Sequence, residues 1–182
     1  MDRRQRKTRE AIFHGFTRLL SQKDFSHITV GEIIAQADIG RATFYAHFET
    51  KDDLLKAFCQ ELFCHIFDTE RDQHHHRHIF ECEGADSVFL HLFTHLQKND
   101  NNILSLLTSR NNDLFLDYFG QELQVLIQSQ LPMFAEKKPQ NIPEDFWEDH
   151  ILSTFTATLK WWLKTGMQES PETVSEYFFS VV

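Results

Sequence analysis

The sequence has 182 residues, of which 41% are hydrophobic, a share that suits a folded core and argues against a disordered chain. Its formal net charge of −9 is unusual for a protein that binds nucleic acid, unless the basic residues are segregated. No apolar run reaches the roughly 18 residues that a membrane helix needs, so we expect no membrane segment.

The charge is unevenly distributed along the chain. Residues 1–56 carry ten Lys or Arg and eight Asp or Glu, a net of +2, whereas residues 57–182 carry eight and 19, a net of −11. One end can therefore approach nucleic acid and the other repels it. The basic start has no apolar core after it, so we expect no signal peptide. Cys59, Cys64 and Cys82 lack paired spacing, which fits a cytoplasmic protein better than a disulfide framework.

The first predicted helix runs from Arg4 to Ser21, and one face of it is apolar. This stripe contains Ile12, Phe16, Leu19 and Leu20, at i, i+4, i+7 and i+8. The helix is preceded and opened by a cluster of basic residues: Arg3, Arg4, Arg6, Lys7 and Arg9. We expect this cluster to extend past the core towards DNA phosphate or a minor groove, an ordinary solvated tail being the alternative.

The next two helices are short and separated by a tight turn. Thr29 and Glu32 form a capping-box pattern at the start of the first, which ends near Ala37. Asp38 tolerates a left-handed turn, and Gly40 can cap the second helix, predicted from Arg41 to Phe48. In that helix Phe44 and Phe48 point inward at i, i+4 and leave a polar face outside, the pattern of a helix-turn-helix. Thr50 then begins a third helix.

The segment TVGEIIAQADIGRATFYAHFETKDDLL resembles the DNA-binding region of the TetR family of bacterial transcriptional regulators. Its most specific part is ATFYAHF followed by a polar residue and KDDLL, and the resemblance extends over roughly Thr8 to Phe58. Asp38 stands where the family usually has Gly, and Gly40 stands where Ser, Thr or Pro is common. Both residues suit a turn and a cap, so the fold is kept while base specificity is left open.

The resemblance, together with exposed positions, implies roles for individual residues. Arg41, Thr43 and Ala46 are the candidates near base edges, and Arg41 is suited to a bidentate contact with guanine. Tyr45 and His47 match the family's phosphate-contacting pair, with simple solvent exposure as the alternative. The other residues predicted to contact the DNA backbone are Thr29 and Lys51 at helix starts, and Arg4, Arg6 and Lys7 in the basic cluster.

The rest of the chain is predicted to be helical, giving an all-α protein of about nine helices. The predicted helices cover Thr50 to Arg71, Asp86 to Gln97, Ile103 to Leu107, Leu114 to Leu131, Asp145 to Lys164 and Ser170 to the end. Prolines assign residues 133–143 to a loop. We therefore expect a helix-turn-helix domain at residues 1–50, followed by a regulatory and dimerisation bundle at residues 51–182.

The family resemblance implies that the bundle holds a small-molecule inducer and forms a homodimer. The chain contains 18 Phe and three Trp, and the residues that could line an apolar pocket are Phe63, Phe67, Phe93, Phe115, Phe119, Trp161 and Trp162. A plain hydrophobic core explains the same stripe of aromatic residues. The last two helices usually pair in the family as a four-helix interface, here provided by Phe155, Leu159, Trp162, Val174, Tyr177 and Phe178.

Histidines form a second, weaker pattern. His74, His75, His76 and His78 precede Cys82, and His91 and His95 are four residues apart. Such groups suit a transition metal, but a polar helix end with ordinary surface or partly buried histidines explains them equally, and no metal motif supports a site. We therefore predict no metal and no cofactor.

Three classes of function remain. The first is a homodimeric repressor that binds a palindromic DNA operator and is released by a small molecule. The second keeps the DNA-binding end but uses the bundle to bind a partner protein, because residues 161–182 are similar to relatives from low-GC Gram-positive bacteria, among them regulators of dihydroxyacetone kinase that act with partner proteins. The third, a metal-dependent enzyme, lacks catalytic spacing, a nucleophile motif and a Gly-rich phosphate loop.

Overall fold

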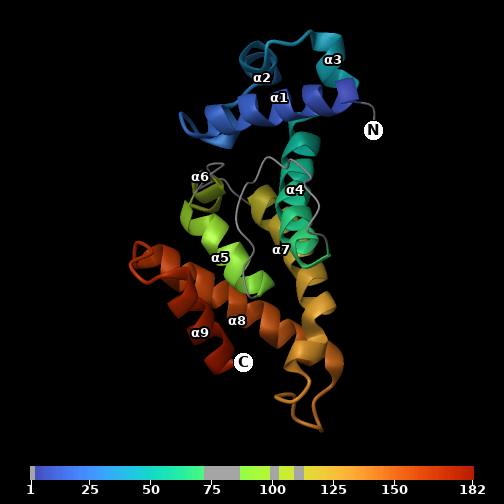
Figure 1. Ribbon diagram of the computed structural model, residues 1–182. Coiled ribbons are helices and arrows are strands. Elements are labelled where there is room, and N and C mark those ends of the chain that lie inside the picture. The colour runs from blue at the N-terminus through green and yellow to red at the C-terminus, as the bar shows by residue number, and fades with distance from the viewer. Residues whose placement is uncertain (1–2, 72–86, 99–102, 109–112) are drawn as a thin grey trace.

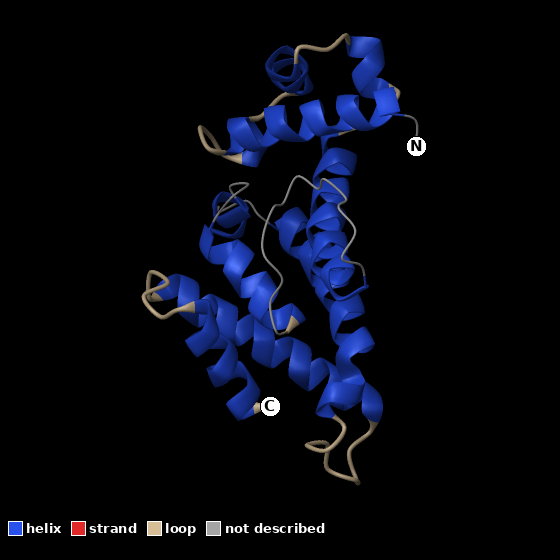
Figure 2. Ribbon diagram, in the orientation of Figure 1, coloured by secondary structure: helices blue, strands red, loops and turns tan. Residues whose placement is uncertain are grey.

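A computed structural model describes the backbone of residues 3–71, 87–98, 103–108 and 113–182, and their side chains except those of 65–71, 105 and 108 (Figure 1). All regular elements in these residues are helical (Figure 2), as the sequence predicts. The α-helices are α1 (Arg3–Leu20), α2 (Val30–Ala37), α3 (Arg41–Tyr45), α4 (Lys51–Arg71), α5 (Val88–Lys98), α6 (Ile103–Thr108), α7 (Asp113–Gln130), α8 (Glu144–Lys164) and α9 (Pro171–Val181). The short 3-10 helices are η1 (Phe25–His27) and η2 (Leu131–Phe134).

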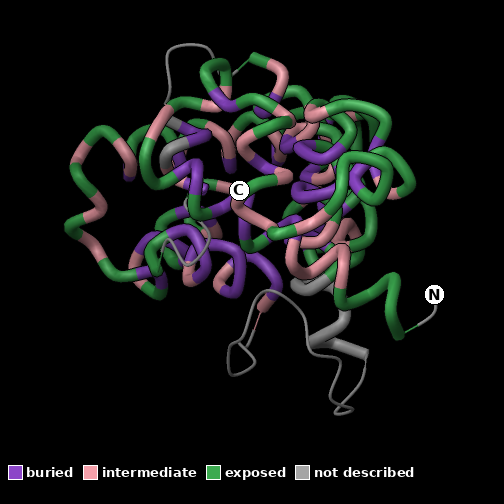
Figure 3. Tube along the Cα trace, turned by 90° about the horizontal axis from the view of Figure 1, so that it is seen from above, coloured by how far each residue is buried: buried purple, intermediate pink, exposed green. Residues whose placement is uncertain are grey.

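The helices form two groups joined by α4. Helix α1 lies across one end of the molecule with α2 and α3 on its outer side, and α4 leads from there into the larger group of α5 to α9 (Figure 1). In that group α4 packs along α7, and α9 packs against both α5 and α8. The first turn of α1 extends from the body as an exposed segment (Figure 3).

Close packing of α1 and α2 holds the small end together. Ile12, Phe16 and Ile33 are completely buried, so the apolar stripe of α1 covers the inner face of α2. A β-carbon placed on Gly15 would lie 3.0 Å from the backbone nitrogen of Ala37, a closer approach than nine in ten real β-carbons make. Glycine at this position therefore allows the two helices to approach each other.

The turn between α2 and α3 has the predicted chemistry. The Thr29 hydroxyl accepts the Glu32 N–H, and the Glu32 carboxylate accepts the Thr29 N–H, which completes the capping box. Asp38 adopts the left-handed conformation with φ 52°. Helix α3 is shorter than predicted, because after Tyr45 the chain continues in tighter turns that bring Phe48 into the core.

Helix α4 belongs to both groups of helices. The Thr50 hydroxyl accepts the Asp53 N–H at its start, as a reciprocal cap. About two turns after Thr50, the ring of Phe58 lies 6.2 Å from that of Phe13 and 5.8 Å from that of Phe16. The core of the small end thus includes the first turns of α4, and we propose that the domain boundary lies within this helix rather than between residues 50 and 51.

Aromatic rings fill the core of the larger group. The ring of Phe89 on α5 lies 5.0 Å from that of Phe178 and 5.8 Å from that of Phe134. The prediction of a loop over residues 133–143 was wrong at its start, because Phe134 is completely buried at the end of η2. Pro132 ends α7 but permits a 3-10 turn that directs Phe134 inward.

Candidate nucleic-acid interface

Helix α3 presents a continuous polar face to solvent. Arg41, Thr43, Tyr45 and Ala46 are exposed, whereas Phe44 is completely buried and anchors the helix. The guanidinium of Arg41 lies 5.9 Å from the centre of the Tyr45 ring, which supports its extended side chain on the helix surface. The structure therefore brings together the residues predicted to contact bases.

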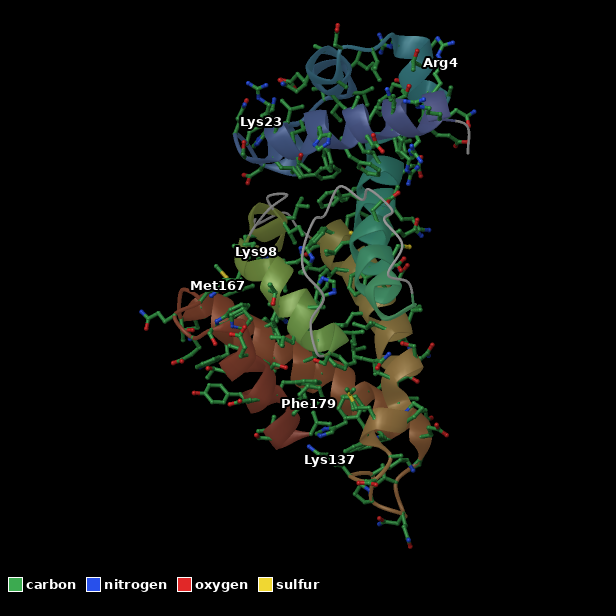
Figure 4. All side chains as sticks on the ribbon, in the orientation of Figure 1. Arg4, Lys23, Lys98, Lys137, Met167 and Phe179 are labelled. Atoms are coloured by element: carbon green, nitrogen blue, oxygen red, sulfur yellow. The ribbon has the colours of Figure 1, made fainter. Side chains whose placement is uncertain are left out.

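The first turns of α1 run beside α3 and form a shallow, open groove with it. Figure 4 shows Arg4 at the end of α1 nearest α3, while Lys23 lies near the opposite end. The groove has a volume of about 340 Å³ and is lined by Arg4, Gln5, Thr8, Ala42, Thr43, Ala46 and His47. Sequence reasoning missed Gln5, Thr8 and Ala42, although Arg4 and Thr8 stand at i, i+4 and so share one face of α1.

The predicted phosphate-contacting pair flanks the end of α3. Tyr45 is 45% exposed, and its ring packs edge-on against Phe44 at 5.5 Å. His47 is half-buried and lies beside the ring of Phe48 at 6.3 Å. Both side chains are thus fixed by the core while their polar ends remain near the surface.

The basic residues of α1 have different surroundings. Lys7 is exposed, and Arg6 is exposed with a long ion pair of 3.7 Å to Glu10, which contributes little at a solvated surface. Arg9 instead donates to Glu61 on α4 at 3.1 Å and lies over the ring of Phe13 at 5.0 Å. Arg4, Arg6 and Lys7 therefore remain open to solvent, and Arg9 ties α1 to α4.

Thr29 and Lys51, predicted to bind DNA phosphate, already make contacts inside the protein. The hydroxyl of Thr29 caps α2 and also donates to the Glu32 carboxylate at 2.8 Å, although the residue is exposed. The Lys51 ammonium donates to carbonyl oxygens of Phe25 and Ile28 at 3.0 Å each. The hydrogen-bond donors of Lys51 therefore already have partners within the protein.

The aromatic residues predicted to line a pocket fall into two packed clusters and one surface position. On α4 and α7, the Phe119 ring lies 5.2 Å from Phe63 and 5.8 Å from Phe115. On α5 and α8, the Phe93 ring lies 5.6 Å from Trp162. Trp161 is 43% exposed and lies beside Tyr177 rather than inside the bundle. The side chain of Phe67 lies outside the described residues.

The predicted dimer residues need a correction. Five of the six are buried within the chain itself: Phe155, Leu159, Trp162, Val174 and Phe178. Their contacts are with their own core, so they are not available on the outer face of α8 and α9. Of the predicted set Tyr177 is exposed, and with Trp161 it forms an aromatic pair at 6.0 Å on this face.

The histidine prediction can be followed only in part. Residues 74–78 and Cys82 lie outside the described residues. His91 and His95 are buried on α5, with their Nε2 atoms 3.1 Å apart. In the part of the chain that is described, no group of three or more His, Cys, Asp or Glu is placed to hold a metal ion. None of the helices described here is long and apolar enough to cross a bilayer.

Comparisons with known proteins agree with this geometry. Residues 12–58 match the family model of "Bacterial regulatory proteins, tetR family", and residues 83–182 match a model described as "Transcriptional regulator C-terminal region". An uncharacterized HTH-type transcriptional regulator of Bacillus subtilis, YxbF, is 39% identical over 69 residues. That match covers 37% of this chain and only 18% of the relative.

Solved structures extend the likeness over the whole chain. A TetR transcriptional regulator from Streptococcus agalactiae is 35% identical, with a TM-score of 0.74 over 100% of this chain and 96% of that one. A TetR-family regulator from Syntrophomonas wolfei, 20% identical, shares the fold with a TM-score of 0.66 over 97% and 93% of the two chains. The Bacillus subtilis relative and the Streptococcus agalactiae structure are both named as transcriptional regulators. The chain belongs to the TetR family of DNA-binding bacterial transcriptional regulators.

Proposed function

We propose that the protein is a homodimeric repressor that inserts α3 into the major groove of a palindromic operator. The observation that carries this proposal is the exposed face of α3 beside the basic first turns of α1. Arg41, Thr43 and Ala46 would then face base edges, and Arg41 is suited to a bidentate contact with guanine.

Phosphate contacts would come from the surroundings of α3. Tyr45 and His47 lie at its end, and Arg4 lies across the groove from it. Arg6 and Lys7 add positive charge on the same turns of α1. Contacts of this kind set the register of a protein on DNA, while the base contacts select the sequence.

A second copy of the chain would pair through the outer face of α8 and α9. The exposed aromatic pair Trp161 and Tyr177 supports this, since large rings are enriched at protein interfaces. Ser153 and Ala157 are also exposed on α8, in the turns before Trp161. Their small side chains would allow another helix to approach. Two recognition helices would then address successive major grooves.

Release would follow from an apolar small molecule that enters the bundle among α4, α5, α7 and α8. Such a ligand shifts the balance between conformations only by binding one of them more tightly. The alternative is a partner protein that binds the bundle, and the contacts among the predicted pocket rings favour it. The rings of Phe63 and Phe119, for example, pack edge-on at 5.2 Å, as they would in a plain core.

Arg41→Ala tests the proposed role of α3. Loss of a bidentate base contact should weaken binding to the selected operator by about 1–3 kcal/mol, with a much smaller effect on a duplex of unrelated sequence. Arg18→Ala is the matched control, because it removes the same charge from an exposed position near the other end of α1. Titrations of both duplexes measure the difference, and equal losses on the two would refute base reading by Arg41.

A further inference from the structure

The side chain of Lys51, the first residue of α4, is directed at the chain segment between α1 and α2. Its ammonium lies 3.0 Å from the carbonyl oxygens of Phe25 and Ile28, 3.4 Å from that of Ser26, and 4.4 Å from the centre of the Phe25 ring. A lysine ammonium has three N–H donors. Each of these three donors therefore has a carbonyl oxygen to bind, and the charge also lies against the face of an aromatic ring.

These carbonyl groups belong to the segment that positions α2. Phe25 and Ser26 form η1, and Ile28 directly precedes Thr29, the cap of α2. Ile28 is 1% exposed, so this backbone is held against the core and its carbonyl groups need partners within the protein. The Phe25 carbonyl also accepts the Ile28 N–H, and the Ile28 carbonyl accepts a hydrogen bond from the ammonium of Lys51, 23 residues further along the chain.

We propose that Lys51 is a positioning residue for DNA recognition and not a phosphate contact. It fixes the start of α2 to the start of α4. Helix α3 follows α2 through a turn closed by the Ile39 N–H donating to the Ile34 carbonyl at 3.2 Å, so the orientation of α3 depends on that of α2. The inference rests on the proposed function, in which α3 reads the operator.

Three roles for Lys51 make different predictions. A phosphate contact contributes to specific and non-specific binding alike and to the dependence of both on salt. A merely structural contact changes thermal stability but leaves the affinity of the folded protein unchanged. A positioning contact affects specific binding by the folded protein and leaves the salt dependence as it was.

Lys51→Met separates these roles, because methionine keeps the length and apolar stem of the side chain but has no donor. The probe is the duplex that the wild-type protein selects from a random-sequence library, compared with an unrelated duplex at several salt concentrations, well below the unfolding midpoint of the variant. We expect specific affinity to fall about tenfold, the scale of a lost hydrogen bond to a charged group, with non-specific affinity and salt slope unchanged. Lys56→Met is the control, because it removes the same charge from an exposed position on α4.

Lys51→Arg gives an independent test if the methionine variant is poorly folded. Arginine is an effective phosphate-binding group, but its planar guanidinium cannot place three donors at the position of the ammonium. A positioning role predicts that Lys51→Arg also loses specific affinity.

The proposal is overturned if Lys51→Arg retains full affinity, if Lys51→Met lowers the salt slope, or if Lys51→Met leaves specific affinity unchanged. Failure of the wild-type protein to select any duplex would instead contradict the proposed function. In that case the contact between Lys51 and residues 25–28 is tested by thermal unfolding without DNA. An unchanged unfolding midpoint for Lys51→Met would refute it.

Discussion

Glu32 joins three parts of the DNA-binding end through one carboxylate. It accepts a hydrogen bond of 2.5 Å from the Lys23 ammonium after α1, and others from the backbone N–H and hydroxyl of Thr29. The bond from Lys23 and then those from Thr29 lower the pKa of Glu32 from its ordinary 4.5 to about 2. The charged form is therefore favoured in the folded protein.

This depressed pKa predicts how stability changes in acid. The contribution of Glu32 is fully present above its unfolded pKa of 4.5, falls as the unfolded chain takes up a proton below that value, and is lost as pH reaches about 2. The difference in free energy of unfolding between wild type and Glu32→Gln should therefore be constant at neutral pH and shrink between these two values. Glu49→Gln is the control, since it removes an exposed carboxylate that does not cap α2. A difference that does not change with pH would contradict this account.

At the residue scale, the sequence predicted local pairs better than distant ones. The capping box of Thr29 and Glu32 and the inward pair of Phe44 and Phe48 follow from spacing alone, and the structure confirms both. The contact of Lys51 with residues 25–28 could not be predicted, because periodicity gives the face of a helix and not its partner. The position of Lys51 at the start of a helix predicted a contact with the DNA backbone instead.

The basic first turns of α1 should act together in DNA binding, because they carry several exposed positive charges next to α3. Log affinity falls as log salt concentration rises, and each phosphate that these residues neutralise should make that slope steeper by about 0.9. Replacing Arg4 and Lys7 together by alanine should therefore lower the slope measured on duplex DNA, whatever its sequence.

The control for this prediction removes two charges elsewhere. Lys160→Ala with Lys164→Ala changes exposed residues on α8, far along the chain from the groove. The slope of this variant should equal that of the wild type. A slope that stays unchanged in the Arg4 and Lys7 variant would show that these residues lie in a solvated helix end without a DNA contact.

At the element scale, helix positions were predictable and some ends were not. The pattern Ser170-Pro171-Glu172 predicted the start of α9, where the Ser170 hydroxyl accepts the Thr173 N–H. By contrast, Pro139 and Pro143 predicted a loop over residues 133–143, which misses Phe134, whose ring stacks on Phe179 at 5.8 Å. The short run Met133-Phe134-Ala135 is too brief to show a period, so the burial of Phe134 depends on contacts with α9 that spacing does not encode.

At the scale of the whole molecule, the charge asymmetry has a structural counterpart. The DNA-binding group of helices carries the excess of basic residues, and the acidic bundle is held at the other end of α4 (Figure 1). An acidic bundle repels the DNA backbone, which supports the proposed approach to DNA through α1 and α3.

The surface proposed for pairing with a second copy was the hardest feature to predict from the sequence. The family's pairing of the last two helices predicted that Phe155, Leu159 and Trp162 face a second copy, but the chain's own core buries all three. An amphipathic pattern does not tell whether the same chain or a second copy covers an apolar face. Burial within the single chain moves the proposed dimer surface to Trp161 and Tyr177.

Mapping the binding sites of the protein across the genome, at the resolution of single base pairs, tests the central claim most directly. A dimer with two copies of α3 predicts a small number of two-fold symmetric sites. Their half-sites should be centred about 34–36 Å apart, one turn of DNA, or at a multiple of that spacing. Isolated half-sites without symmetry, or many weak sites without a shared sequence, would contradict a dimeric repressor that reads DNA through α3.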